Sequence, residues 1–179
     1  MRSNKFIGNM PKETINNRMN NLKYRRVKLI IYSINIILVD QISKFLVVKK
    51  LGFDVSVNVI PNILNFTLVK NKGAAFSLFS NSTSFLTILS ALASLLLITF
   101  ILKSPPRSYW NSLGLVYLLG GTIGNGIDRF FKGYVIDFFE LVPIHFAIFN
   151  VADVSINIAM VCFIIAIFID KNQSRILKK

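Results

Sequence analysis

The sequence contains only one cysteine and one histidine among its 179 residues. Cys162 alone can form neither an intramolecular disulfide nor a thiolate metal site, and His145 alone cannot build a histidine metal centre. The chain also lacks HExxH, a P-loop and GxGxxG, the motifs of zinc proteases, nucleotide hydrolases and dinucleotide-binding proteins. We therefore expect neither a metal nor a cofactor.

Charged residues are scarce as well, at 16% of the chain against roughly 25% in soluble domains. Hydrophobic residues make up 53%, and the mean hydropathy is +0.57. Long uncharged runs predict a polytopic membrane protein with a single membrane domain. The net charge of +13 lies mostly in tails and loops, so we interpret it as orienting the chain in the bilayer. No nucleic-acid partner is expected.

Apolar segments occur at four places, each close to the ~20 residues that cross a bilayer. Between the first two, VSVNVI and LNFTLV alternate in polarity and predict short strands. The expected fold is an all-α membrane protein of four transmembrane helices, with a small extracytoplasmic β-rich loop between helices 1 and 2. A flexible basic cytoplasmic tail is expected at 1–28, the membrane domain at 29–170 and a second basic tail at 171–179. The apolar segments are 29–48, 85–102, 109–127 and 148–169.

Lysines and arginines divide unequally between the two sides of this topology. With the amino terminus inside, fourteen lie on the inner side and six in the outer loops. The positive-inside rule therefore predicts that both termini are cytoplasmic. The first apolar run is longer than the apolar part of a signal peptide and has no small-residue cleavage site, so we expect it to be retained.

Polar residues inside the predicted spans gather in the outer half of the bilayer. At ~1.5 Å per helical residue, Asp40, Lys44, Asn125 and Asp153 all fall there. Asp137 precedes the last span in the outer connection. Spacings of three to four residues place Asn150, Asp153 and Asn157 on one helix face. These positions predict a polar pocket between helices near the outer surface.

Acidic residues concentrate between positions 120 and 153, which hold four of the eight in the chain. Asp153, inside a span, is functional by default; alternatively, it is a solvated residue that favours a helix start. Asp137 has apolar neighbours that would raise its pKa; alternatively, it is a loop acid paired with Arg129 or Lys132. If the two carboxylates lie close together they share a proton, and can divide the roles of acid and base around a water.

Other polar and small residues have competing interpretations. Asp40 and Lys44, at i and i+4, favour a structural ion pair, while in the alternative Lys44 extends to the membrane interface. Asn71 is a turn residue or a donor to substrate, and composition leaves both open. The glycines Gly120, Gly121 and Gly124 would let another helix approach closely.

Taken in order, four motifs resemble the bacterial lipoprotein signal peptidase (signal peptidase II) family: DQISK (40–44), NKGAAFS (71–77), GGTIGNGIDRFFKGYVIDFFE (120–140) and FNVADVSINIA (149–159). The resemblance spans about residues 29–170. It implies a metal-free integral-membrane aspartic protease, which cuts diacylglyceryl-modified prolipoproteins just before the lipidated cysteine. This sequence departs from the usual pattern of the family in its 28-residue amino-terminal tail, in Thr122 in place of a more usual alanine, and in a short connection between the two aspartates.

The resemblance also implies residue roles and surroundings. The catalytic residues would be Asp137 and Asp153, and Asp128 would be structural. Diacylglyceryl-prolipoproteins and membrane lipid would be the partners, and we expect a monomer in the bacterial cytoplasmic (inner) membrane with its site near the outer face. The substrate-binding or site-supporting residues would be Asp40, Lys44, Asn71, Gly121, Asn125, Arg129 and Asn150.

Two other classes of function compete with a protease. A proton- or ion-coupled transporter could use Asp40, Lys44 and Asp153 as a relay. It predicts polar residues through the full membrane depth and often an internal repeat, whereas the inner halves hold only mildly polar residues and no carboxylate, and no repeat is visible. A scaffold subunit would leave two buried carboxylates without a purpose. The sequence therefore favours the protease.

Overall fold

The computed structural model describes residues 12–73, 82–106, 108–144 and 147–176. His145 and most of the NKGAAFS motif, residues 74–77, lie outside the described residues. The described chain is mostly helical. Its elements are α1 (Lys12–Lys50), β1 (Ser56–Ile60), β2 (Leu64–Asn71), α2 (Thr83–Lys103), α3 (Tyr109–Lys132), β3 (Val135–Leu141), the short 3₁₀ helix η2 (Val142–Ile144) and α4 (Val151–Ile176).

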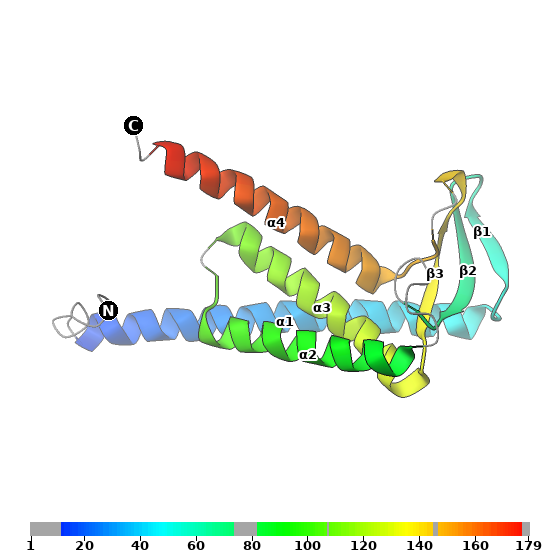
Figure 1. Cartoon of the computed structure of the whole chain (residues 1–179), viewed down its shortest axis with the longest axis horizontal. Coiled ribbons are helices and arrows are strands. Elements are labelled where there is room, and N and C mark those ends of the chain that lie inside the picture. The colour runs from blue at the N-terminus through cyan, green and yellow to red at the C-terminus, as the bar shows by residue number, and fades with distance from the viewer. Residues whose placement is uncertain (1–11, 74–81, 107, 145–146, 177–179) are drawn as a thin grey trace.

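The helices run along the long axis of the molecule, and the sheet stands across one end of them (Figure 1). Helix α3 occupies the centre and packs against α1, α2 and α4. An apolar cluster joins α1, α2 and α3. It is formed by the buried side chains of Leu29, Ile101, Leu115, Val116 and Leu119. The strand-bearing end, where α4 begins, is also where the predicted polar residues lie.

Among the described residues, three helices are long and apolar enough to cross a membrane: α1 within 16–50, α2, and α4 within 151–169. The chain is therefore a multi-pass membrane protein. Helix α3 is 24 residues long, but Asn125, Asp128 and Arg129 lower its apolar content. The predicted fourth helix is thus present, while its role as a fourth membrane span stays a prediction.

Helix α1 begins earlier than the sequence indicated. Residues 12–28, which we expected to form part of a flexible tail, continue the membrane helix, so that α1 is 39 residues long. At ~1.5 Å per residue it measures about 58 Å, well beyond a ~30 Å hydrocarbon core. Extending an existing helix adds one hydrogen bond per ordered residue, and no Gly or Pro interrupts this stretch. Pro11 stands just before the first helical residue.

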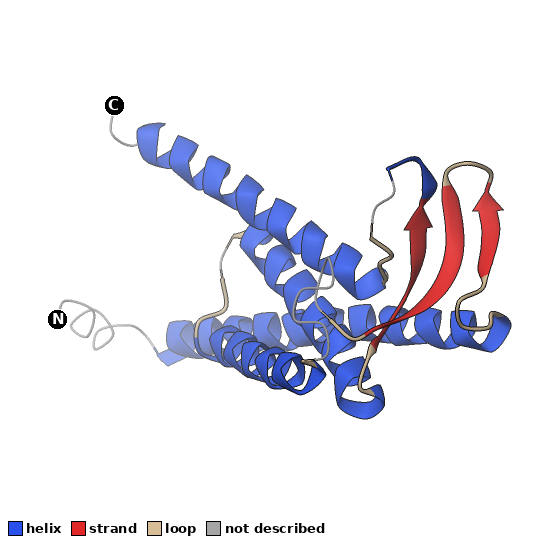
Figure 2. Cartoon of the chain, turned by 45° about the vertical axis from the view of Figure 1, so that its right-hand side comes forward, coloured by secondary structure: helices blue, strands red, loops and turns tan. Residues whose placement is uncertain are grey.

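The three strands form one antiparallel sheet in the order β1-β2-β3 (Figure 2). The two strands predicted between helices 1 and 2 are confirmed. Strand β3 was missed, because VIDFFEL lacks a simple alternation of polar and apolar residues. It is covered on both sides: Ile136 and Phe138 pack with Val47 and Leu68, while Asp137 lines a cavity. The sheet is therefore shared between two connections, not confined to one loop.

Glycines allow the close approach of α3 to its neighbours that the sequence predicts. A Cβ on Gly121 would lie 2.5 Å from the carbonyl oxygen of Ala152, in the first turn of α4. A Cβ on Gly124 would lie 2.7 Å from Oδ2 of Asp40 on α1. Both distances are far below van der Waals contact, so only glycine fits at these two helix crossings.

Candidate active site

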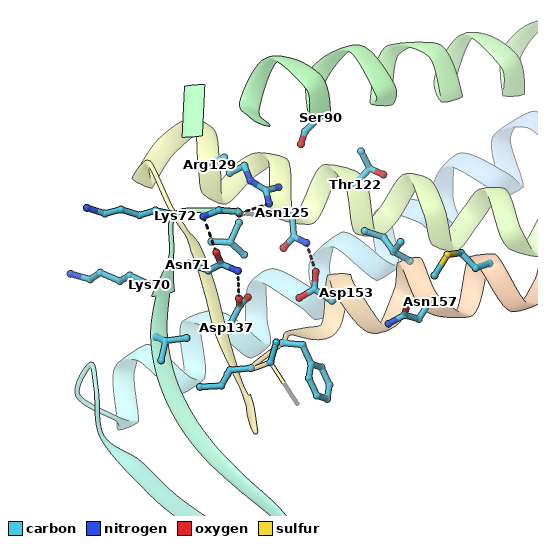
Figure 3. Close-up of a pocket in the computed structure, with 18 residues that line it drawn as sticks. Lys70, Asn71, Lys72, Ser90, Thr122, Asn125, Arg129, Asp137, Asp153 and Asn157 are labelled. Atoms are coloured by element: carbon cyan, nitrogen blue, oxygen red, sulfur yellow. Dashed lines mark hydrogen bonds between the residues drawn. The ribbon is translucent and has the colours of Figure 1, made fainter. Parts of the chain in front are cut away.

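Asp137 and Asp153 line the same cavity, about 670 Å³ in volume, between the sheet and the ends of α3 and α4 (Figure 3). Asp137 is only 2% exposed, whereas Asp153 is half-buried. The cavity lies at the strand-bearing end of the helices. Asn71, Asn125 and Arg129 also line it, so strand β2, helix α3, strand β3 and helix α4 each contribute a polar side chain.

Strand β3 positions Asp137 opposite β2. Its Oδ2 accepts a hydrogen bond from Nδ2 of Asn71 at 2.8 Å, and its Oδ1 accepts one from Nδ2 of Asn150 at 2.6 Å. Asn71 is itself oriented by the backbone N–H of Gly73, which donates to its Oδ1 at 2.9 Å. Both oxygens of Asp137 are thus held by amides, and its carboxyl plane is fixed.

The start of α4 positions Asp153. Asn150 caps the helix: its Oδ1 accepts from the N–H of Asp153 at 3.0 Å, and Oδ2 of Asp153 accepts from the N–H of Asn150 at 3.1 Å. This reciprocal pair satisfies two backbone donors at a helix start, as in a capping box. The other carboxylate oxygen, Oδ1, accepts from Nδ2 of Asn125 at 2.8 Å.

Two asparagines connect the carboxylates to each other. Nδ2 of the fully buried Asn150 donates to Oδ1 of Asn125 at 3.0 Å as well as to Asp137. Asn125 in turn donates to Asp153. The result is a continuous chain of hydrogen bonds from one carboxyl group to the other. Such a pair, facing a common cavity, can hold a water and exchange protons with it.

The pKa of Asp137 is raised from 3.8 to about 6. Burial is the largest cause, since it penalises the ionised form, and the negative charge of Asp153 adds to it. The hydrogen bonds from Asn71 and Asn150 and the charge of Lys44 oppose the rise. Asp137 therefore retains a proton at a pH where an ordinary carboxyl group has lost it.

This raised pKa predicts a pH-dependent stability. Asp137 loses its proton near pH 3.8 in the unfolded chain and near pH 6 in the folded chain. The contribution of this group to the free energy of unfolding is therefore fully present below pH 3.8 and is lost as the pH rises to about 6. The loss is at most about 3 kcal/mol, at ~1.36 kcal/mol per pKa unit. The melting temperature of Asp137→Asn, measured relative to that of wild type, should therefore be higher at about pH 7.5 than at about pH 4.

Thermal unfolding in detergent at the two pH values measures this difference. The matched control is Asp54→Asn, because Asp54 is an exposed carboxylate with a φ of 61°, a backbone conformation that asparagine also tolerates. A difference between wild type and Asp137→Asn that does not change with pH would contradict the raised pKa.

A buried ion cluster supports the site from α1. Nζ of Lys44 lies 2.8 Å from Oδ2 of Asp40 and 2.9 Å from Oδ2 of Asp128, and all three side chains are at most 1% exposed. Nζ also donates to Oδ1 of Asn125 at 3.1 Å. The structural ion pair predicted from the i, i+4 spacing is confirmed. The alternative, in which Lys44 extends to the interface, is wrong.

The two carboxylates of this cluster hold the backbone beside each candidate catalytic residue. Oδ1 of Asp40 accepts from the N–H of Ala152 at 2.9 Å, one residue before Asp153. Oδ2 of Asp128 accepts from the N–H of Ile136 at 3.2 Å, one residue before Asp137. The cluster therefore links the end of α1 to the positions of both aspartates.

Arg129 projects into the cavity and donates from Nη2 to the carbonyl of Gly73 at 3.3 Å. Its buried Nε has no hydrogen-bond partner within the described structure. The sequence left open that Asp137 pairs with Arg129 or Lys132, but within the described ranges Asp137 forms an ion pair with neither residue. Instead, Nζ of Lys132 lies 2.7 Å from Oδ1 of Asp128.

Every predicted site residue lies at this end of the fold, but apart from the ion pair of Asp40 and Lys44 the sequence did not predict the contacts between them. The role of Asp128 as an anchor for β3 was missed, because β3 itself was missed. Gln41, which donates to Asp40 and to the carbonyl of Gly124, was also missed and carries no clear sequence signal. Among described residues, no cluster of three or more His, Cys, Asp or Glu could hold a metal.

The fold and the cavity together define a multi-pass membrane protein with a paired-carboxylate site. Comparison with known proteins then gives the family. The model described as Signal peptidase (SPase) II matches residues 32–169, and the chain belongs to the signal peptidase II family.

Relatives and solved structures agree with this assignment. The lipoprotein signal peptidase of Parasynechococcus marenigrum is 41% identical over 151 residues, covering 84% of this chain and 95% of that protein. That of Trichormus variabilis is 47% identical over 128 residues, covering 72% and 81%. A solved bacterial membrane enzyme at 2.3 Å resolution superposes with a TM-score of 0.75 at 30% identity, covering 82% of this chain and 90% of that one.

Proposed function

We propose that Asp137 and Asp153 are the catalytic pair with which this signal peptidase II, a hydrolase, removes signal peptides from prolipoproteins. The substrate class is diacylglyceryl-modified prolipoprotein, cut just before the lipidated cysteine. The observation that carries the proposal is the hydrogen-bond chain through Asn125 and Asn150 that joins two carboxylates on one cavity. That arrangement fits acid/base catalysis by an aspartic endopeptidase.

In the proposed reaction, one carboxylate is ionised and takes a proton from a water held between the pair. The water oxygen forms a bond to the scissile carbonyl carbon while the protonated carboxyl donates to the carbonyl oxygen. The tetrahedral intermediate then collapses, the carbon–nitrogen bond breaks, and a carboxyl proton passes to the leaving amine. The raised pKa of Asp137 favours it as the protonated partner at rest, although a coupled pair titrates as a unit.

The remaining site residues have proposed supporting roles. Asn71 and Arg129 bind the backbone of the extended substrate, and their place in the lining of the cavity supports this assignment. Gly121 keeps α3 close to the start of α4. Asp40, Lys44, Asn125 and Asn150 hold the two carboxylates in place without contacting the scissile bond.

We further propose a topology with four membrane spans, including α3, and both termini in the cytoplasm of a bacterial inner membrane. Helix α3 measures about 36 Å at ~1.5 Å per residue, enough to span ~30 Å. The excess of Lys and Arg in 1–28 and 171–179 supports this orientation. In this orientation the cavity lies near the outer face of the membrane. Residues 29–170 form the protease domain. One chain supplies the whole site, so a monomer surrounded by membrane lipid suffices.

Cleavage of a purified diacylglyceryl prolipoprotein by the full chain in detergent, with EDTA present, tests the function. We expect a lipidated mature protein whose amino-terminal residue, identified by mass spectrometry, is the modified cysteine. The matched control is the same precursor without the diacylglyceryl group, which should remain uncut. Equal cleavage of both precursors would contradict the proposed substrate class, and cleavage of neither would contradict the protease assignment for this chain.

A further inference from the structure

A second cavity, about 570 Å³ in volume, lies between α3 and α4 and is lined almost entirely by apolar side chains. On α4 these include Val154, Ile158 and Val161, which are 37%, 37% and 55% exposed. From α3, Trp110 and Tyr117 complete the groove. Its volume lies within the ~300–1,000 Å³ typical of ligand sites. We call it the α3–α4 groove.

The groove adjoins the catalytic cavity, because Phe149 and Asn157 line both. Asn157 is four residues beyond Asp153, so it lies on the same helix face, about 6 Å further along the axis. Figure 3 shows the Asn157 side chain beside the cavity, next along α4 from Asp153. It is exposed, and no hydrogen bond involves it in the described structure. A single polar group therefore stands where a polar cavity joins an apolar groove.

We propose that the α3–α4 groove binds one acyl chain of the substrate's diacylglyceryl group, and that Asn157 donates a hydrogen bond to the ester carbonyl of that chain. This inference rests on the proposed function. In such a substrate the ester groups follow the modified cysteine at the cleavage site by a few bonds, and an apolar chain follows each ester. The order of groups in the protein is the same: carboxylates, then a lone amide, then an apolar groove.

The groove contributes orientation more than affinity. An acyl chain in the bilayer is already in an apolar environment, so moving it into the groove yields little hydrophobic free energy. Fixing the chain and its ester does restrict where the neighbouring peptide bond can lie, which favours attack by the catalytic water. Asn157 is thus a specificity-determining residue for the lipid part of the substrate.

The ester contact is tested with two synthetic lipopeptides, one carrying a diester and the other a diether that lacks both carbonyl groups. A net hydrogen bond corresponds to about a three- to tenfold preference, so wild type should cleave the diester with a higher kcat/KM by that factor. Asn157→Leu should cleave both lipopeptides equally, with the diester rate falling to the diether rate. Equal cleavage of both by wild type would overturn the role of Asn157.

The groove is tested separately with Val161→Trp, which fills it, using dipalmitoyl and dihexanoyl lipopeptides. We expect about a fivefold fall in kcat/KM for the long-chain substrate and little change for the short-chain one. The matched control is Ile164→Trp, an exposed position on the same helix outside both cavities. An equal effect on both substrates, or none, would mean that bulk membrane lipid fills the groove and would overturn the proposal.

These outcomes are distinct from failure of the proposed function. If wild type cleaves neither lipopeptide, the protease assignment itself is contradicted. If it cleaves all of them without regard to ester or chain length, the function stands and the acyl-chain site is wrong. Should Asn157→Leu not fold, Val161→Trp still decides whether the groove takes a substrate chain.

Discussion

Asp137→Asn and Asp153→Asn should each lower kcat/KM for prolipoprotein cleavage by about 1,000-fold, within the ~10²–10⁴ range of general acid–base groups. Asparagine retains the shape of the side chain but can neither accept a proton from water nor donate one to the leaving amine. Single-turnover cleavage in detergent measures the loss. Because the pair acts as a unit, the double variant should be about as inactive as each single variant.

The matched control for these variants is Asp54→Asn, which removes an exposed carboxylate outside the cavity and should leave turnover unchanged. Each variant must also elute as a monodisperse peak at normal yield. Near-wild-type turnover by either Asp137→Asn or Asp153→Asn would contradict the catalytic pair. The candidate catalytic residues would then be Asp128 and Asp40, the other buried carboxylates at this end of the fold.

Lys44→Met should lower the free energy of unfolding by about 3–5 kcal/mol, the cost of breaking a buried ion pair by removing one partner. Nζ of Lys44 lies within 3 Å of both Asp40 and Asp128, and neither carboxylate has any exposed surface. Methionine matches the length of lysine but leaves two buried charges close together. Denaturant unfolding in detergent, followed by circular dichroism, measures the change.

Lys49→Met is the matched control, since it removes an exposed lysine from the last turn of the same helix and should change stability by less than about 0.5 kcal/mol. Adding Asp40→Asn to Lys44→Met should restore part of the stability, because Asp40 then no longer carries a buried charge that has lost its cation, whereas Asp128 keeps Lys132 at 2.7 Å. A Lys44→Met protein as stable as the control would show that the cluster does not hold the fold together.

Much of the site could be predicted because each residue carries a local signal. Carboxylates and amides are costly inside a membrane span, so Asp40, Asn125 and Asp153 stand out in their apolar segments. The i, i+4 spacing of Asp40 and Lys44 predicts their ion pair, which the structure contains. The alternation in residues 55–69 predicts the first two strands, which are also present.

Strand β3 and its contacts could not be predicted in the same way. An alternating pattern arises when one face of a strand meets water, whereas β3 packs against a core on one face and lines the cavity on the other. The partners of Asp137 are Asn71 and Asn150, 66 and 13 residues away in sequence. No local spacing reports such pairs, because they depend on how β2 and α4 are placed.

By itself, the sequence determined a mostly helical membrane chain, its polar residues near one end, and the resemblance that named its family. These follow from hydropathy, helical period and short motifs, all of which act within one segment. Only the tertiary structure decided that Asp137 and Asp153 share a cavity, that Asp128 anchors β3, and that an apolar groove adjoins the site. Those features depend on packing between segments distant in sequence, which Gly121 permits against the backbone of Ala152 and Gly124 permits against the side chain of Asp40.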